Sequence, residues 1–193
     1  MRLMRKPLDR YDSPRWMMDS LFSVIPLQGR ALEPCVGSGH WIRHTGLEWV
    51  TNDIDPTVEA DYHLDATLPS SWERFDVGAV ITNPPFNQAD AILANALRRS
   101  YFVAFLLRAN WDEPTKSRYE LLRDYPYNCK IVLPRYCFAK STKTGKWQTD
   151  SCTCHWYIWC SQPPTNLVVY SPDDINGFSK FTRNPDEELA AWR

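Results

Sequence analysis

Four consecutive residues, Asn83-Pro84-Pro85-Phe86, form an unusual end to a short apolar run at 77–81. Each proline fixes its own φ and lacks an N–H group, so the backbone around the pair is stiffened. The side-chain amide oxygen of Asn83 and the carbonyl oxygen of Pro84 are both hydrogen-bond acceptors. Two acceptors held in a fixed geometry are suited to binding the two hydrogens of a planar amine, and Phe86 offers a flat apolar face to the ring that carries the amine.

This arrangement fits methylation of the exocyclic amine of a nucleobase. Two aligned acceptors favour a more tetrahedral nitrogen, whose lone pair can then point at an electrophilic methyl group such as that of a sulfonium compound. No strong general base is needed before the attack, because the proton leaves after the nitrogen has become cationic, and an aromatic face tolerates that charge. Taken alone, the tetrapeptide also fits a proline-rich turn with a buried phenylalanine.

A glycine-containing loop follows an earlier apolar run at 29–33. Gly37 and Gly39 allow the backbone to turn tightly and to approach a ligand closely. The loop lacks the full dinucleotide fingerprint GxGxxG, because Ile42 stands where the third glycine would be. The carboxylate of Glu33 would repel a pyrophosphate, so this loop is better suited to a cationic ligand.

Two further carboxylates follow later apolar segments. Asp53 is placed to accept hydrogen bonds from the two hydroxyls of a ribose, and its neighbour Ile54 can pack on the face of an adenine. Asp65 can accept a hydrogen bond from the exocyclic amine of that adenine. Each acid by itself also fits a cap or a turn. Three acids at three successive strand ends predict a ligand site, because ligands of open α/β sheets bind at the carboxyl edge.

Apolar runs alternate with helix-like segments over most of the chain, as in a mostly parallel α/β sheet covered on both faces. Strands are expected at 29–33, 48–52, 77–81, 101–107, 130–133 and 153–160, with a weaker one at 61–64 and a further one at 167–170. Helices are expected at 39–46, 88–99 and 114–123. Another is expected at 13–25, with Ser13 as its N-cap and Pro14 as its first helical residue.

Length and composition indicate one globular domain over 1–193, with a basic segment at 1–12 and a C-terminal extension at 161–193. The chain is 44% hydrophobic and 23% charged, which is ordinary for such a domain. No stretch approaches the roughly 20 apolar residues of a membrane span. The N-terminus also lacks the apolar core of a secretory signal, so we expect a bacterial or host cytoplasm.

The six cysteines show no CxxC pair, so we expect free thiols rather than a disulfide framework. Three of them lie close to His155, but Cys-x-Cys is a poor metal-binding spacing, and we expect no metal site.

The net charge of −1 does not by itself indicate a nucleic-acid-binding protein. Basic residues nevertheless gather in the N-terminal segment and again at 135–146, a stretch without acids that contains Arg135, Lys140, Lys143 and Lys146. Such a stretch fits contacts to phosphates, and it also fits a solvated loop.

In their order along the chain, these segments resemble the class I S-adenosylmethionine-dependent methyltransferases, and among them the DNA amino-methyltransferases with an (N/D/S)PP(Y/F) signature. The matching stretches are YDSPRWMMDSLF, EPCVGSGHW, NDIDP, LDAT and NPPF, which span residues 11–86. Downstream, LPRYCF and TDSCTCHWYIW resemble the later strands of small phage-type adenine methyltransferases. The resemblance implies a Rossmann-like fold with a seven-stranded, mostly parallel sheet, one antiparallel strand, and helices on both faces.

The resemblance also implies the residues of a site. Those that would bind S-adenosylmethionine are Glu33, Pro34, Cys35, Gly37, Asp53, Ile54, Asp65 and Asn83. The catalytic loop would be Asn83, Pro84, Pro85 and Phe86. The substrate would be contacted by Phe86, Arg135, Phe138, Lys140 and Lys143, with Phe138 in the position of an aromatic that stacks on a flipped base. We therefore expect an S-adenosylmethionine-dependent methyltransferase acting on adenine N6, with DNA favoured over RNA as the partner.

The chain also departs from its larger relatives. It has no room for the target-recognition domain of restriction-type enzymes, so we expect a short target sequence, a partner subunit or a structured nucleic acid. Asn83 favours adenine N6 over cytosine N4, for which serine is more usual, and Phe86 favours nucleic acid over a protein glutamine. RNA adenine methylation, DNA cytosine N4 methylation, glutamine methylation and a catalytically silent binding subunit are the alternatives.

Overall fold

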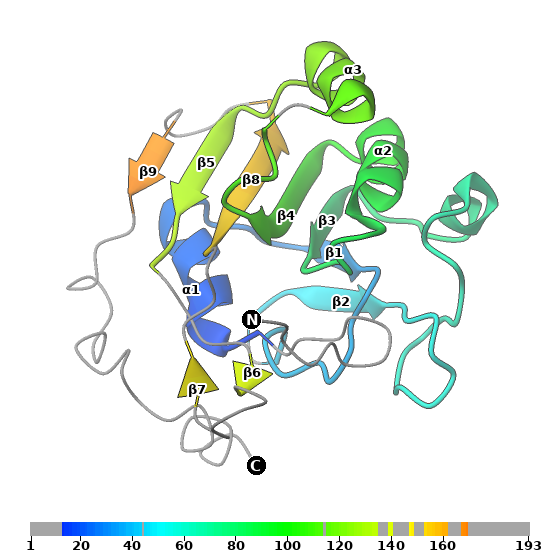
Figure 1. Ribbon diagram of the computed structural model, residues 1–193. Helices are drawn as coiled ribbons and strands as arrows, with labels where there is room; N and C mark the ends of the chain where they lie inside the picture. Colours follow the sequence, from blue (N-terminus) through cyan, green and yellow to red (C-terminus); the bar gives the residue numbers. More distant parts are fainter. Residues whose placement is uncertain are drawn as a thin grey trace.

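The computed structural model describes residues 13–43, 45–113, 115–134, 139–140, 147–148, 153–161 and 167–169. Its centre is a sheet with the strand order β2-β1-β3-β4-β8-β5-β9 (Figure 1). The strands are β1 Arg30–Glu33, β2 Glu48–Thr51, β3 Ala79–Thr82, β4 Phe102–Arg108, β5 Cys129–Val132, β8 Cys154–Cys160 and β9 Leu167–Val169. Two short strands, β6 Ala139–Lys140 and β7 Trp147–Gln148, form a separate antiparallel pair.

Strand β8 runs antiparallel to the rest of the described sheet. It pairs with β4 along its whole length and with β5 on its other side. The remaining pairs, β1–β2, β1–β3, β3–β4 and β5–β9, are parallel. The expected mostly parallel sheet with one antiparallel strand is therefore confirmed.

The sheet is not composed of the expected set of strands. The segment at 61–64 makes a single bridge to Asn52 instead of a strand, while β9 fills a place at the opposite edge. Side chains take over the hydrogen bonds that a strand would make at this edge of β2. The carboxylate of Asp61 accepts the N–H of Thr51 at 2.8 Å, and the amide of Asn52 binds both the N–H and the C=O of Leu64.

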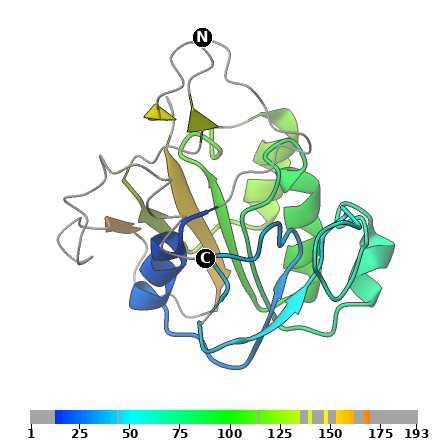
Figure 2. The same ribbon diagram turned by 90° about the horizontal axis from the view of Figure 1, so that it is seen from below.

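Helices cover both faces of the sheet, as Figure 2 shows. Helix α1, Arg15–Val24, lies on one face, and helices α2, Ala89–Arg99, and α3, Lys116–Asp124, lie on the other, with a short 3-10 helix at Pro69–Glu73. Ser13 is not the N-cap of α1, because Pro14 takes that position and no side chain caps the helix. None of the helices in the described ranges is long and apolar enough to cross a bilayer.

The expected helix at 39–46 is wrong, since its described residues form turns. Gly39 and Gly46 have φ values of 66° and 79°, in the left-handed region that ends a right-handed helix. Between them, the buried ring of Trp41 stacks on Trp156 of β8, with a centroid distance of 5.5 Å and an interplanar angle of 9°. The packing of this indole, rather than helical hydrogen bonding, holds the segment.

Two apolar cores lie on opposite faces of the sheet, because successive strand residues point to opposite sides. The core under α1 includes Met17, Met18, Leu21, Ile81, Leu106 and Trp156. The core under α2 and α3 includes Val80, Ile92, Leu93, Phe105, Tyr157 and Trp159. The inner strands β3 and β4 are buried on both faces. Polar side chains that act on a ligand are therefore confined to the strand ends and the loops that follow them.

Candidate active site

The ends of β1 and β3 are joined by a hydrogen bond between two buried side chains. The hydroxyl of Thr82 donates to the Oε1 atom of Glu33 at 2.5 Å. Thr82 is the last residue of β3, directly before the Asn-Pro-Pro-Phe loop, and Glu33 is the last residue of β1, directly before the glycine loop. The structure therefore brings together two loops that lie about fifty residues apart in the sequence.

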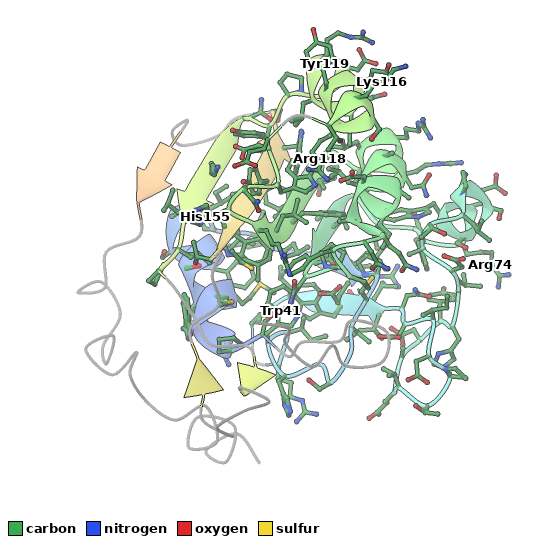
Figure 3. All side chains as sticks on the ribbon, viewed as in Figure 1. Trp41, Arg74, Lys116, Arg118, Tyr119 and His155 are labelled. Atoms are coloured by element: carbon green, nitrogen blue, oxygen red, sulfur yellow. The ribbon has the colours of Figure 1, made fainter. Side chains whose placement is uncertain are left out.

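Glu33 is fully buried, and its carboxylate is bound by groups of this chain. Besides Thr82, it accepts the N–H of Cys35 at 3.0 Å and the indole N–H of Trp41 (Figure 3) at 3.1 Å. Burial raises the pKa of Glu33 to about 8, because the three hydrogen bonds favour the charged form but do not offset the lost hydration. Through its bonds to Cys35 and Trp41, Glu33 thus fixes the conformation of the glycine loop.

Asp53 follows β2 and faces the glycine loop. Its Oδ2 atom accepts the N–H of Gly37 at 2.9 Å, and its Oδ1 atom accepts the N–H of Asp55 at 3.0 Å. A carboxylate has about four lone-pair positions, so each oxygen keeps one after these bonds. The side chain is only half-buried, and it can offer one acceptor to each of two neighbouring hydroxyls.

The next two predicted residues continue this edge. Ile54 is 49% exposed, a large value for an aliphatic side chain, so its surface can pack on a ring. Asp65 is half-buried, and its Oδ1 atom accepts the N–H of Thr67 at 2.9 Å and the Thr67 hydroxyl at 2.6 Å. The hydrogen bonds that the described residues make with the Asp65 side chain use Oδ1, so Oδ2 can accept from an amine.

Asn52 is a site residue that the sequence reasoning missed. It is fully buried, and its Nδ2 atom donates to the backbone carbonyls of Pro34 at 2.9 Å and Leu64 at 3.0 Å. It therefore fixes the glycine loop to the segment that carries Asp65. The available signal was a polar residue at the end of an apolar run, directly before an acid. The predicted residue Pro34 is buried, and its carbonyl oxygen is used in this contact.

The side chain of Asn83 is oriented by the start of α1. Its Nδ2 atom donates to the hydroxyl oxygen of Ser13 at 2.7 Å. This hydrogen bond fixes the orientation of the Asn83 amide plane. The role of Ser13 was also missed, since a serine before a proline and an apolar helix is the usual signature of an N-cap.

Pro84 is buried, whereas Pro85 and Phe86 are half-buried, and the carbonyl of Pro85 accepts the N–H of Gln88 as the chain turns into α2. The guanidinium of Arg108, the last residue of β4, lies over the Phe86 ring with its Cζ atom 4.9 Å from the ring centroid. Arg108 is the third residue that the sequence reasoning missed. The sequence signal that could have identified it is an arginine at the end of a wholly apolar run.

The predicted substrate residues Arg135, Phe138 and Lys143 lie outside the described residues. Lys140 belongs to β6, and the structure describes only the pairing of its backbone with β7. The predicted contacts of all four residues with substrate stay predictions.

Within the described ranges, no three His, Cys, Asp or Glu side chains are grouped as metal ligands. The Nδ1 atom of His155 accepts the N–H of Leu133 at 3.1 Å, and burial lowers the pKa of this ring. Burial and the carboxylates of Glu33 and Asp53 raise the pKa of the Cys35 thiol. Cys35 and Cys129 are free thiols.

The fold resembles those of several solved structures. A Listeria monocytogenes protein assigned to the class I S-adenosylmethionine-dependent methyltransferases has a TM-score of 0.50 at 10% identity, over 88% of this chain and 69% of its own. Precorrin-8w decarboxylase from Methanobacterium thermoautotrophicum has a TM-score of 0.48 at 12% identity, over 80% and 95% of the two chains.

Precorrin-6y C5,15-methyltransferase from Geobacter metallireducens has a TM-score of 0.47 at 13% identity, over 79% and 94% of the chains. A scan against protein-family models and a comparison with curated protein sequences found no match. With the strand order and the helices on both faces, the first of these likenesses confirms the expected Rossmann-like class I methyltransferase fold.

Proposed function

We propose that this chain is an S-adenosylmethionine-dependent methyltransferase that transfers a methyl group to the exocyclic amine of a nucleobase, adenine N6 in DNA. The observation that carries the proposal is the 2.5 Å hydrogen bond between Thr82 and Glu33. It fixes the start of the Asn-Pro-Pro-Phe loop beside the start of the glycine loop. An amine bound by the first loop would then lie next to a methyl donor bound by the second.

The side chains beside the glycine loop suit S-adenosylmethionine, which supplies an electrophilic methyl group when it is bound. Asp53 keeps one acceptor position on each oxygen for the two ribose hydroxyls, and the exposed side of Ile54 suits the adenine face. The Oδ2 atom of Asp65 is available for the adenine amine. With its pKa at about 8, the carboxyl group of Glu33 is mostly protonated at neutral pH in the chain alone, and a sulfonium cation bound nearby would favour its ionised form.

The substrate amine is bound and oriented by the loop after β3. The Oδ1 atom of Asn83 and the carbonyl of Pro84 would accept its two hydrogens, and Ser13 holds the amide of Asn83 in the required orientation. Phe86 would lie against the base. Because the attack leaves the nitrogen cationic and acidic, the proton can be lost to solvent afterwards, and the site needs no separate general base.

Methyl transfer from labelled S-adenosylmethionine to duplex DNA, single-stranded DNA and RNA tests this proposal. We expect labelled N6-methyladenine in DNA, lost in Asn83→Ala with little change in the affinity for cofactor. Asn128→Ala is the matched control. Asn128 is exposed and precedes β5, so it lies at the amino-terminal ends of the parallel strands, away from the Asn-Pro-Pro-Phe loop. Transfer to RNA alone, or to neither nucleic acid, would refute the DNA assignment. Full activity of the Asn83 variant would refute its role.

A further inference from the structure

The ring of Phe86 has a cation over one of its faces. Its side chain packs against the core beneath α1 and is half-buried there. The guanidinium of Arg108 lies over the ring, with 4.9 Å between Cζ and the centroid. A base that stacks on this face of Phe86 has to take the place of the guanidinium.

The backbone of Arg108 is fixed by hydrogen bonds, whereas its side chain makes the contact with Phe86 but no hydrogen bond or ion pair with another described residue. Its carbonyl accepts the N–H of Trp111 at 2.8 Å and the hydroxyl of Tyr157 at 3.3 Å, and its backbone is paired with Cys154 in β8. The side chain is exposed, and no carboxylate among the described residues forms an ion pair with it. The five N–H donors of the guanidinium can therefore turn to an external anion without breaking an ion pair.

Arg43, Arg74 and Arg98, like Arg108, form no ion pair with a described residue, whereas some other arginines of the described ranges have acidic partners. Three of these pairs are Arg15 with Asp19, Arg30 with Glu48, and Arg118 with Asp90. An arginine without one, at the carboxyl edge and beside the loop that would bind the reacting amine, is better placed for a ligand than for stability.

We propose that Arg108 binds a phosphate group of the target nucleotide, and that it covers Phe86 until the target base replaces it. This inference rests on the proposed function and narrows its substrate class. A guanidinium binds a phosphate through two parallel hydrogen bonds, and unstacked bases bind to aromatic faces. If the guanidinium stayed over the Phe86 ring, it would repel the positive charge that develops on the amine. Binding to the phosphate moves the guanidinium away from the ring. The alternative substrate, a protein glutamine, has a neutral side chain and would offer Arg108 no anion to bind.

The test measures binding rather than activity, so it is independent of methyl transfer. A short single-stranded oligodeoxynucleotide with one adenine among thymines is titrated with the protein over a range of salt concentrations, in the presence of S-adenosylhomocysteine. If Arg108 contacts one phosphate, Arg108→Gln should reduce the slope of log affinity against log salt by about 0.7, the value for one contact to a single strand. Arg108→Lys keeps the charge and should keep the slope.

Arg98→Gln is the matched control, because it removes the same charge from the exposed end of α2, about 14 Å along the helix from Ala89 at 1.5 Å per residue. We expect it to leave the slope unchanged. Equal slopes for the wild type and Arg108→Gln, or equal reductions in Arg108→Gln and Arg98→Gln, would overturn the inference. If the wild type transfers no methyl group but Arg108→Gln still reduces the salt dependence of binding, the proposed function is refuted and this inference is supported.

Discussion

Replacement of Glu33 by glutamine tests how the glycine loop is held, because it removes a buried ionisable group. The pKa of Glu33 is about 8 in the folded chain, against 4.5 without the influence of the fold. The difference, 8 minus 4.5, is about 3.5 pH units, and at about 1.4 kcal/mol per unit it corresponds to about 5 kcal/mol. The folded state holds this proton more tightly than the unfolded state. The free energy of unfolding should therefore fall by about that amount as the pH rises from about 4.5 to about 8.

Urea denaturation of the wild type and Glu33→Gln between pH 5 and pH 9 measures this contribution. The wild-type curve should fall by up to about 1.4 kcal/mol per pH unit inside the window, and the variant should lack this slope. The amide oxygen of the variant can still accept from Cys35 and Thr82, but its amide nitrogen would face the indole N–H of Trp41. That conflict costs about 1–3 kcal/mol at every pH, so the slope is the informative quantity.

His155 contributes with the opposite sign and has to be separated from Glu33. Its pKa is lowered by burial, so its contribution is present above about pH 6.5 and is lost as the pH falls. Both proteins contain His155, so it cancels when one curve is subtracted from the other. If the two curves run parallel between pH 5 and pH 8, Glu33 is already ionised in the folded chain and the reasoning about its burial is wrong.

Two further substitutions test the contacts around the site. Ser13→Ala removes the acceptor for the amide nitrogen of Asn83, so kcat for methyl transfer should fall about fivefold, equivalent to about 1 kcal/mol, with cofactor affinity unchanged; an unaltered kcat would exclude an orienting role. Arg118→Met should lower the free energy of unfolding by about 2 kcal/mol in urea denaturation, because Arg118 of α3, labelled in Figure 3, forms a partly buried ion pair with Asp90 of α2. Arg123→Met should leave the unfolding curve unchanged, because the Arg123 ion pair is exposed, and equal losses in the two variants would contradict this reasoning.

The strands and the candidate site could largely be anticipated because they depend on strong local signals. Buried parallel strands read as continuous apolar runs, and the parallel arrangement brings their ends to one edge. Residues that end such runs, among them Glu33, Asp53 and Asn83, were therefore expected at that edge; Glu33 ends β1, and Asp53 and Asn83 follow β2 and β3. Their individual contacts depend on side chains that are distant in the sequence, which no local pattern encodes. The donation from Thr82 to Glu33 is the clearest case.

The expectations that proved wrong depended on local preferences that distant contacts overrode. Ser13 has the preference of an N-cap, but Asn83, seventy residues away, uses its hydroxyl. The segment at 39–46 has a helix-like pattern, but Trp41 is buried by stacking on Trp156 of β8. Two glycines that adopt left-handed conformations then exclude the helix.

The position of β8 has a consequence for synthesis of the protein on the ribosome. This strand comes from late in the sequence, yet it lies between β4 and β5 and pairs with both. A nascent chain that has emerged only as far as Val132 exposes the apolar edges of β4 and β5 with no strand between them. Open edges of this kind are templates for pairing with other chains. We therefore expect the nascent chain to be prone to aggregation until Cys160 has emerged.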